Sequence, residues 1–182
     1  MAPNVINNSW GCDGSEGCQG SEMLQVVKNI EAAGIIIVVS AGNDGSSCGT
    51  IADQPATISD DTLSVGAHNH RTGKIASFSS RGPSKLDRKI GPDVTAPGVT
   101  IRSSVKSGGY ESARWIGTSM AGPHVVGEVA LLWSAVPALK GNIAATTYVI
   151  ENFAETCGDT GDTHGESIKC ADNYATWVTL FQ

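Results

Sequence analysis

The 182-residue sequence contains no run of the roughly 18 apolar residues that a membrane-spanning helix requires. It has no C-x-x-C pair, which disfavours a structural zinc site. Positive charge is also scarce, because 12 Lys and Arg stand against 18 Asp and Glu and leave a net charge of −6. Nucleic acids and anionic membranes are bound by clustered Lys and Arg. We therefore expect neither a nucleic acid nor a membrane as the main partner.

The first residues lack the pattern of a signal peptide, which is a basic start followed by an apolar stretch. Instead, Met1-Ala2-Pro3 leads at once into a strand-like run. We interpret Met1 as an added start on a piece of a longer protein, and a genuinely short gene is the alternative.

Five cysteines leave one without a partner if all the others pair. An oxidising, secreted context with one or two disulfides is the expected setting. The first pairings to consider are Cys12–Cys18 and Cys157–Cys170. Cys48 could replace either partner of the first pair, and the sequence leaves the connectivity open. We expect an extracellular location for the parent protein.

Apolar patterns of strands and helices alternate along the chain. Residues 35–39 are five consecutive β-branched residues, which predict a fully buried strand of a parallel sheet. Apolar residues at helical spacing predict a helix over 22–33, closed by Gly34. We also predict strands at 4–10, 63–67, 75–79 and 101–105, and a helix at 142–153. The predicted fold class is α/β, with three layers and a mainly parallel sheet flanked by helices. In such sheets the chemistry lies at the carboxyl ends of the strands.

The run from Gly117 to His124 (GTSMAGPH) precedes a long apolar pattern at three- and four-residue spacing. The pattern predicts a buried helix, and Thr118 or Ser119 can cap its first turn. The N-terminus of a helix carries free N–H groups and positive potential, which stabilise negative charge on a reacting oxygen. A capping serine before a core helix is the plain alternative.

This run resembles the nucleophile motif of subtilisin-like serine proteases, over a stretch that extends from about residue 4 to 150. The resemblance implies a serine endopeptidase that forms an acyl-enzyme on Ser119. It divides the chain into a partial peptidase domain at 1–156 and a divergent tail at 157–182. The family's aspartate and histidine segments come earlier than anything present here. We therefore expect the N-terminal portion of the domain, with both residues, to be missing, and to be a partner of this chain.

The segment Ser40-Ala41-Gly42-Asn43 directly follows the buried strand at 35–39. It resembles the family segment that supplies the side-chain donor of the oxyanion hole, and the matching residue is Asn43. The resemblance implies that Ser40, Ala41 and Gly42 bind substrate. An ordinary asparagine in a glycine-rich turn is the alternative.

Ser9-Trp10-Gly11 resembles the family's substrate-binding strand, to which an extended peptide adds through main-chain hydrogen bonds. The Trp10 side chain could line a hydrophobic pocket for a substrate side chain, or it could pack in the core. Laid over the family's pattern, Asp53 comes near the foot of the main specificity pocket, where a carboxylate would favour Lys or Arg in the substrate. A solvated loop aspartate is the alternative. Thr118, next to the nucleophile, is also expected to bind substrate.

No histidine of this chain matches the family's catalytic one. His124 lies five residues after Ser119, about 140° further around a helix, so we interpret it as a buried, hydrogen-bonded helix residue. His68, His70 and His164 are expected in polar loops. Glu128 falls among small residues of the predicted helix, where its carboxylate must reach solvent or a partner.

The expected function is peptide-bond hydrolysis with a peptide or protein substrate and no cofactor or metal ion. Family members often bind calcium, but no acidic ligand cluster stands out. One alternative is a catalytically inactive fragment or pseudoprotease that binds peptides. The other is a hydrolase with a nucleophile elbow, which lacks the required strand before Ser119. We also expect an exposed sheet edge, with low stability or self-association of the isolated chain.

Overall fold

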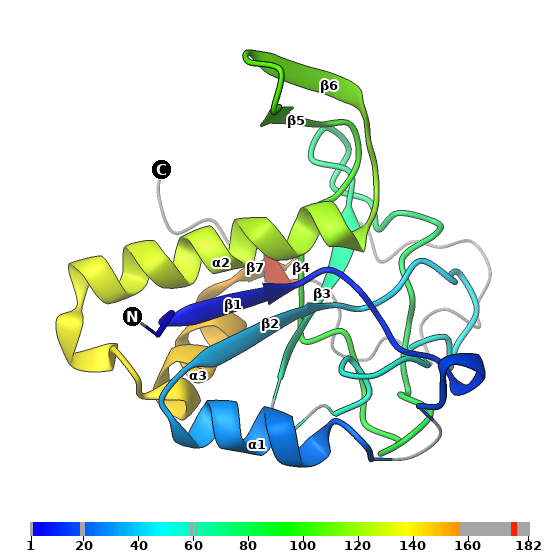
Figure 1. Cartoon of the computed structure of the whole chain (residues 1–182). Coiled ribbons are helices and arrows are strands. Elements are labelled where there is room, and N and C mark those ends of the chain that lie inside the picture. The colour runs from blue at the N-terminus through cyan, green and yellow to red at the C-terminus, as the bar shows by residue number, and fades with distance from the viewer. Residues whose placement is uncertain (1, 19–20, 59, 61, 157–175, 178–182) are drawn as a thin grey trace.

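The computed structural model describes residues 2–18, 21–58, 60, 62–156, 176 and 177. The helices are α1 (Leu24–Ala32), α2 (Thr118–Ala135) and α3 (Ile143–Phe153), with 3-10 turns η1 (Gly14–Glu16) and η2 (Pro137–Leu139). The strands are β1 (Val5–Asn8), β2 (Ile36–Ser40), β3 (Leu63–His68), β4 (Val94–Pro97), β5 (Ile101–Ser104), β6 (Tyr110–Trp115), β7 (Glu155–Thr156) and β8 (Thr176–Trp177). Helices lie on both faces of the main sheet (Figure 1), which confirms the expected three-layer α/β class.

The main sheet has the strand order β1-β2-β3-β4-β8-β7. Neighbours from β1 to β8 are parallel, and only β7 runs antiparallel to β8. The register places Val5 opposite Ile36 and Val38 opposite Leu63. The prediction of a mainly parallel sheet is therefore confirmed. Most of the expected tail lies outside the described residues, but Thr176 pairs with β7 and Trp177 with both β7 and β4, so the boundary at 156 remains a prediction.

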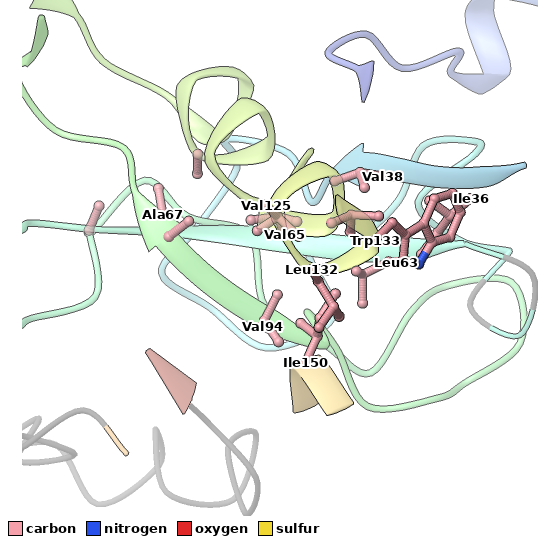
Figure 2. Close-up of a cluster of buried hydrophobic side chains, with 14 residues drawn as sticks. Ile36, Val38, Leu63, Val65, Ala67, Val94, Val125, Leu132, Trp133 and Ile150 are labelled. Carbon is pink, nitrogen blue, oxygen red and sulfur yellow. The ribbon is translucent and has the colours of Figure 1, made fainter. Parts of the chain in front are cut away.

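The β-branched run of β2 is buried on both faces of the sheet. Ile36 and Val38 point toward α2 and α3 and join the larger core cluster shown in Figure 2. Ile37 and Val39 point the other way and pack with Val27 of α1. This alternation follows from the two-residue period of a strand. It explains why the sequence shows continuous apolar residues here instead of alternating ones.

Strand β1 is the outermost strand on its side of the sheet, as far as the described residues go. Helix α2 lies close against this strand, since a Cβ added at Gly122 would be 2.9 Å from the side-chain oxygen of Asn7. Val5 and Ile6 are half-buried. The expected sheet edge is therefore present at β1.

Two regions differ from the predicted elements. Residues 75–79 are not a strand, because Ile75 makes only an isolated bridge to His68 and Ser79 turns back to accept a hydrogen bond from the Ala67 N–H. The strand that pairs with β3 on the side away from β2 is β4, which was not predicted. Strands β5 and β6 pair with each other and form a hairpin that stands away from the main sheet (Figure 1).

The disulfide Cys12–Cys18 is present, as predicted. Cys48 is also disulfide-bonded, so it does not replace either partner of that pair. The predicted pair Cys157–Cys170 lies outside the described residues. Within the part of the chain that the structure describes, none of the helices is long and apolar enough to cross a membrane.

Candidate active site

Helix α2 begins at Thr118, directly after Gly117. Gly117 has φ 149°, a value that favours glycine. The N-cap residue Gly117 makes no side-chain cap, so the expected capping by Thr118 or Ser119 is wrong. Instead, the side-chain oxygen of Asn43 accepts a hydrogen bond from the Thr118 N–H at 2.9 Å. Thr118 and Ser119 already lie inside the helix, so their hydroxyls cannot cap the first N–H groups of that helix. The cap comes instead from a residue 75 positions earlier in the sequence.

The Asn43 amide has a fixed orientation. Its oxygen accepts from both the N–H and the hydroxyl of Thr118, the latter at 3.1 Å. Its NH₂ group is left free, since it donates to no other described residue. Asn43 is exposed and lies on the loop after β2. A fixed, unoccupied amide donor beside a helix N-terminus is suited to stabilise a developing oxyanion.

Ser119 is held against the segment that follows β1. Its hydroxyl donates to the Ser9 carbonyl oxygen at 3.4 Å, and the Ser9 hydroxyl donates to the Ser119 carbonyl oxygen at 3.1 Å. Ser9 and Asn43 follow neighbouring parallel strands, so both reach the same edge of the sheet. The structure therefore brings together Ser9, Asn43 and Ser119 from three separate parts of the sequence.

The remaining residues of the loop after β2 support Asn43. The Ser40 hydroxyl donates to the Asn8 carbonyl oxygen at 3.4 Å, and the Ala41 N–H donates to Val65 at 3.0 Å. Gly42 has φ 104°, and a Cβ there would lie 2.8 Å from the Ser80 hydroxyl. The Ser40 contact joins this loop to the residue before Ser9, and the other two contacts hold the loop against Val65 and Ser80.

Thr118 is fully buried, unlike a residue that lines an open subsite. Its hydroxyl lies 3.3 Å from the Gly42 carbonyl oxygen and 3.1 Å from the Asn43 side-chain oxygen. These contacts of Thr118 help to fix the orientation of the Asn43 side chain. Its expected contact with substrate stays a prediction.

Trp10 and Gly11 follow Ser9 on the surface. Trp10 is 54% exposed, which excludes the alternative of a core tryptophan. A Cβ added at Gly11 would lie 2.8 Å from the Cβ of Asp53, so glycine permits this close approach. The Cys12 N–H and carbonyl oxygen both bond to Gln54, at 2.8 and 3.1 Å. Asp53 is thereby held next to the predicted substrate-binding segment.

The other side of Ser119 is open. A cleft of about 340 Å³ lies between the first turns of α2 and the hairpin β5–β6. Its lining includes Ser119, Met120 and His124 from the helix side and Trp115 from the hairpin. The indole N–H of Trp115 is buried and has no hydrogen-bond partner among the described residues. Sequence reasoning missed Trp115, because its strand pairs outside the main sheet and follows no clear alternating pattern.

Two histidines of the described region, His124 and His68, are hydrogen-bonded to groups other than Ser119. His124 is exposed and not buried as expected, because it sits on the outward side of α2, and its Nδ1 bonds to the Met120 carbonyl oxygen at 2.9 Å. His68 lies in β3, not in a loop, and its Nδ1 is 3.1 Å from the Thr95 hydroxyl. Burial lowers the pKa of His68 to about 4, with smaller contributions from His124 and His70. Among the described residues, none of these rings bonds to the Ser119 hydroxyl. His164 lies outside the described residues.

Glu128 lies on α2 one turn after His124. It is buried, although a carboxylate at this position was expected to reach solvent or a partner. One of its carboxyl oxygens has no hydrogen-bond partner among the described residues. Burial raises the pKa of Glu128 to about 7. The neutral form is favoured more than in a solvated carboxyl group, because an ionised carboxylate loses hydration here without gaining a partner.

The described residues contain no group of three or more His, Cys, Asp or Glu that could hold a metal ion. The expectations about calcium and cofactors stay predictions.

The model of the subtilase family (peptidase S8) matches residues 1–166. Bacillopeptidase F of Bacillus subtilis is 43% identical over 144 residues, which cover 77% of this chain and 10% of that protein. Subtilisin E of the same organism is 42% identical over 135 residues, which cover 74% of this chain and 32% of that protein.

Solved structures agree with the sequence relatives. The S41 psychrophilic protease superposes with a TM-score of 0.69 at 29% identity, covering 83% of this chain and 48% of that one. Sphericase superposes with a TM-score of 0.67 at 28% identity, with the same coverage. This chain thus spans about half the length of the similar structures and a third or less of these two curated relatives.

Proposed function

Because the chain belongs to the subtilase family of serine proteases, we propose that it supplies the nucleophile and the oxyanion hole of a serine endopeptidase. The observation that carries this proposal is the arrangement of Asn43 around the start of α2. Its amide oxygen caps Thr118, and its NH₂ is left free beside Ser119. An asparagine that served only to cap a turn would not need to lie next to a serine at the N-terminus of a helix.

In the proposed reaction the Ser119 hydroxyl attacks the carbonyl carbon of a peptide bond. The carbonyl oxygen becomes negative and accepts hydrogen bonds from the Asn43 NH₂ and the Ser119 N–H. The serine proton passes to a base and then to the leaving amine, which departs as the C–N bond breaks. Water next attacks the acyl-enzyme with the same base, which releases the acid product and restores Ser119.

The base of this reaction is a histidine outside this chain, oriented by an aspartate that is also outside it. The positions of His68 and His124 support this assignment, since both are bonded away from the Ser119 hydroxyl. The open cleft beside Ser119 and Trp115 offers space for such a segment. The N-terminal portion of the same domain is the proposed partner that fills it.

The substrate is an extended peptide or protein segment that lies along Ser9, Trp10 and Gly11. Main-chain hydrogen bonds to this segment would hold it, as in other cases of strand addition. Ser40 and Ala41 support the neighbouring loop. We assign no cofactor, no nucleic acid and no membrane as a partner. The disulfide Cys12–Cys18 supports an extracellular location.

The test is hydrolysis of fluorescein-labelled casein by the gene product as it is encoded in full, compared with its Ser119→Ala variant. The wild type should cleave casein, and the variant should lose several orders of magnitude in rate, because the members of a catalytic triad act as a unit. Unchanged hydrolysis by Ser119→Ala would overturn the proposal.

A peptide-binding pseudoprotease is the second candidate. The observation that favours it is the lack of a histidine bonded to Ser119 among the described residues. It predicts that the full gene product binds peptides but cleaves none. Casein hydrolysis that depends on Ser119 would exclude it.

A further inference from the structure

Ser80 lies against the loop that carries Asn43 and contacts the backbone on both sides of that residue. The Ser80 N–H donates to the Gly42 carbonyl oxygen at 3.0 Å, and the Ser80 hydroxyl accepts a hydrogen bond from the Asp44 N–H at 3.0 Å. Ser80 itself is completely buried. One buried residue therefore holds both the residue before Asn43 and the residue after it.

The fit between Ser80 and the loop leaves no room for a side chain at Gly42. A Cβ added there would lie 2.8 Å from the Ser80 hydroxyl oxygen, closer than real Cβ atoms approach a neighbour. Further along the loop, the Gly45 N–H donates to the Phe78 carbonyl oxygen at 2.8 Å. The loop from 42 to 45 is thus fitted closely to the segment that ends at Ser80.

The contacts of Ser80 continue to the Asn43 amide. The Gly42 carbonyl oxygen, which accepts from Ser80, also lies 3.3 Å from the Thr118 hydroxyl. Thr118 in turn donates its N–H to the Asn43 side-chain oxygen at 2.9 Å. Thr118 fixes the far end of the Asn43 side chain, whereas Ser80 fixes the backbone from which that side chain starts. The two together hold the NH₂ group at one position.

The position of the NH₂ group matters because an oxyanion donor acts only at hydrogen-bond distance from the reacting oxygen. A displacement of about 1 Å can cost about 100-fold in rate. Without the Ser80 hydroxyl, the N–H of the exposed Asp44 can bond to water, and the loop is free to move away. We infer that Ser80 is a positioning residue of the oxyanion hole, which acts by holding the loop on each side of Asn43. This inference rests on the proposed function, because it assigns a role within the same reaction.

The experiment measures kcat and KM of the full gene product with a peptide p-nitroanilide as substrate. Ser80→Ala keeps the N–H that bonds to Gly42 and removes only the acceptor of the Asp44 N–H. It should lower kcat by about 10-fold with little change in KM, a part of the loss of about 10²- to 10³-fold expected when an oxyanion donor is removed. Ser80→Cys fills the same space with a weaker acceptor and should lose less kcat than Ser80→Ala.

A double variant shows whether Ser80 acts through Asn43. Once Asn43→Ala has removed the amide, the position of the loop no longer affects the oxyanion. Ser80→Ala added to Asn43→Ala should therefore cause no further loss of kcat. A residue that only stabilised the fold would give the same relative loss in both backgrounds.

Ser79→Ala is the matched control for the loss of a buried hydroxyl. Ser79 is also buried, and its hydroxyl likewise accepts one backbone N–H at 3.0 Å, but that N–H belongs to Ala67 of β3. Ser79→Ala should unfold at a lower urea concentration than the wild type while it keeps the wild-type kcat.

The outcomes separate this inference from the proposed function. An unchanged kcat in Ser80→Ala, an equal loss in Ser79→Ala, or a further loss in the double variant would overturn the inference. Hydrolysis that still depends on Ser119 would then leave the proposed function in place. A wild type whose hydrolysis is absent, or is unaffected by Ser119→Ala, would overturn both.

Discussion

The two sides of the nucleophile are built very differently. On the closed side, toward β1 and β2, Ser119 and Thr118 are hydrogen-bonded to Ser9 and Asn43. On the open side, toward the hairpin β5–β6, a cleft separates the helix from Trp115, whose indole N–H has no partner among the described residues. Buried polar groups in native proteins are rarely left unpaired. The difference supports the proposal that the chain holds the oxyanion half of a catalytic site, with the base on another segment.

The same contrast extends along helix α2. Where α2 meets α3, the Trp133 indole N–H donates to the Thr146 hydroxyl at 2.8 Å. One turn beyond His124, which lines the cleft, Glu128 keeps an unpaired buried oxygen. The Trp133 indole on the packed side is satisfied within the chain, whereas the Trp115 indole at the cleft and one oxygen of Glu128 have no partner among the described residues.

The largest effect is expected from the closed side. Asn43→Ala in the active gene product should lower kcat by about 10²- to 10³-fold with little change in KM, the loss typical of removing one oxyanion donor, for which a subtilisin is the reference case. Asn43→Asp keeps an acceptor for the Thr118 N–H but lacks the NH₂ group. It should lose as much kcat while unfolding at a similar denaturant concentration. A larger effect on KM than on kcat would contradict the oxyanion role.

Glu128, one turn of α2 beyond the cleft residue His124, provides a pH-dependent test. Burial raises its pKa from 4.5 to about 7, so the folded chain holds this proton more tightly than the unfolded chain. The stabilising contribution of the protonated form is therefore complete below pH 4.5 and is lost as the pH rises through 7. The full change is about 3 kcal/mol, at about 1.4 kcal/mol per pKa unit.

Glu128→Gln removes this titration and should stabilise the chain at pH 8 relative to the wild type. Urea unfolding at pH 4.5, 6 and 8 measures the difference. Asp93, whose pKa burial raises to about 6, is present in both proteins and cancels in the comparison. A wild type and variant that follow parallel curves with pH would show that Glu128 has found a partner.

The smallest expected effects come from one substitution on the packed side of α2 and one at the open cleft. Trp133→Phe removes a satisfied hydrogen bond and should cost about 1 kcal/mol of unfolding free energy. Trp115→Phe removes an N–H group that has no partner in the described structure and should change stability by less than about 0.5 kcal/mol. Thermal unfolding of both variants under one condition makes the test. An equal loss from Trp115→Phe would mean that the open side is already satisfied.

Sequence patterns predicted strand β2 and helices α2 and α3 well, although they missed the interior strand β4. The five β-branched residues of 35–39 and the helical spacing of α2 and α3 depend on local periodicity, and the structure confirms these elements within one or two residues. The strand predicted at 75–79 does not form, because the Ser79 hydroxyl accepts a hydrogen bond from the Ala67 N–H of β3.

The site itself was only partly predictable. The motif around Ser119 and the loop around Asn43 pointed to the chemistry through resemblance. The cap on α2 joins residues 75 positions apart, so no local capping pattern could show it. The burial of Glu128 and the cleft beside Trp115 depend on how the helix and the hairpin pack, which a linear pattern does not contain.

The most direct test of this divided site is labelling of the isolated chain with a fluorescent fluorophosphonate, which reacts with activated serines. Near-ultraviolet circular dichroism on the same sample establishes that the chain is folded. The account predicts that the folded wild type labels no faster than Ser119→Ala, because no base reaches the serine. Rapid labelling of the wild type that disappears in Ser119→Ala would show that the chain contains its own base, and would contradict the assignment of the histidine to another segment.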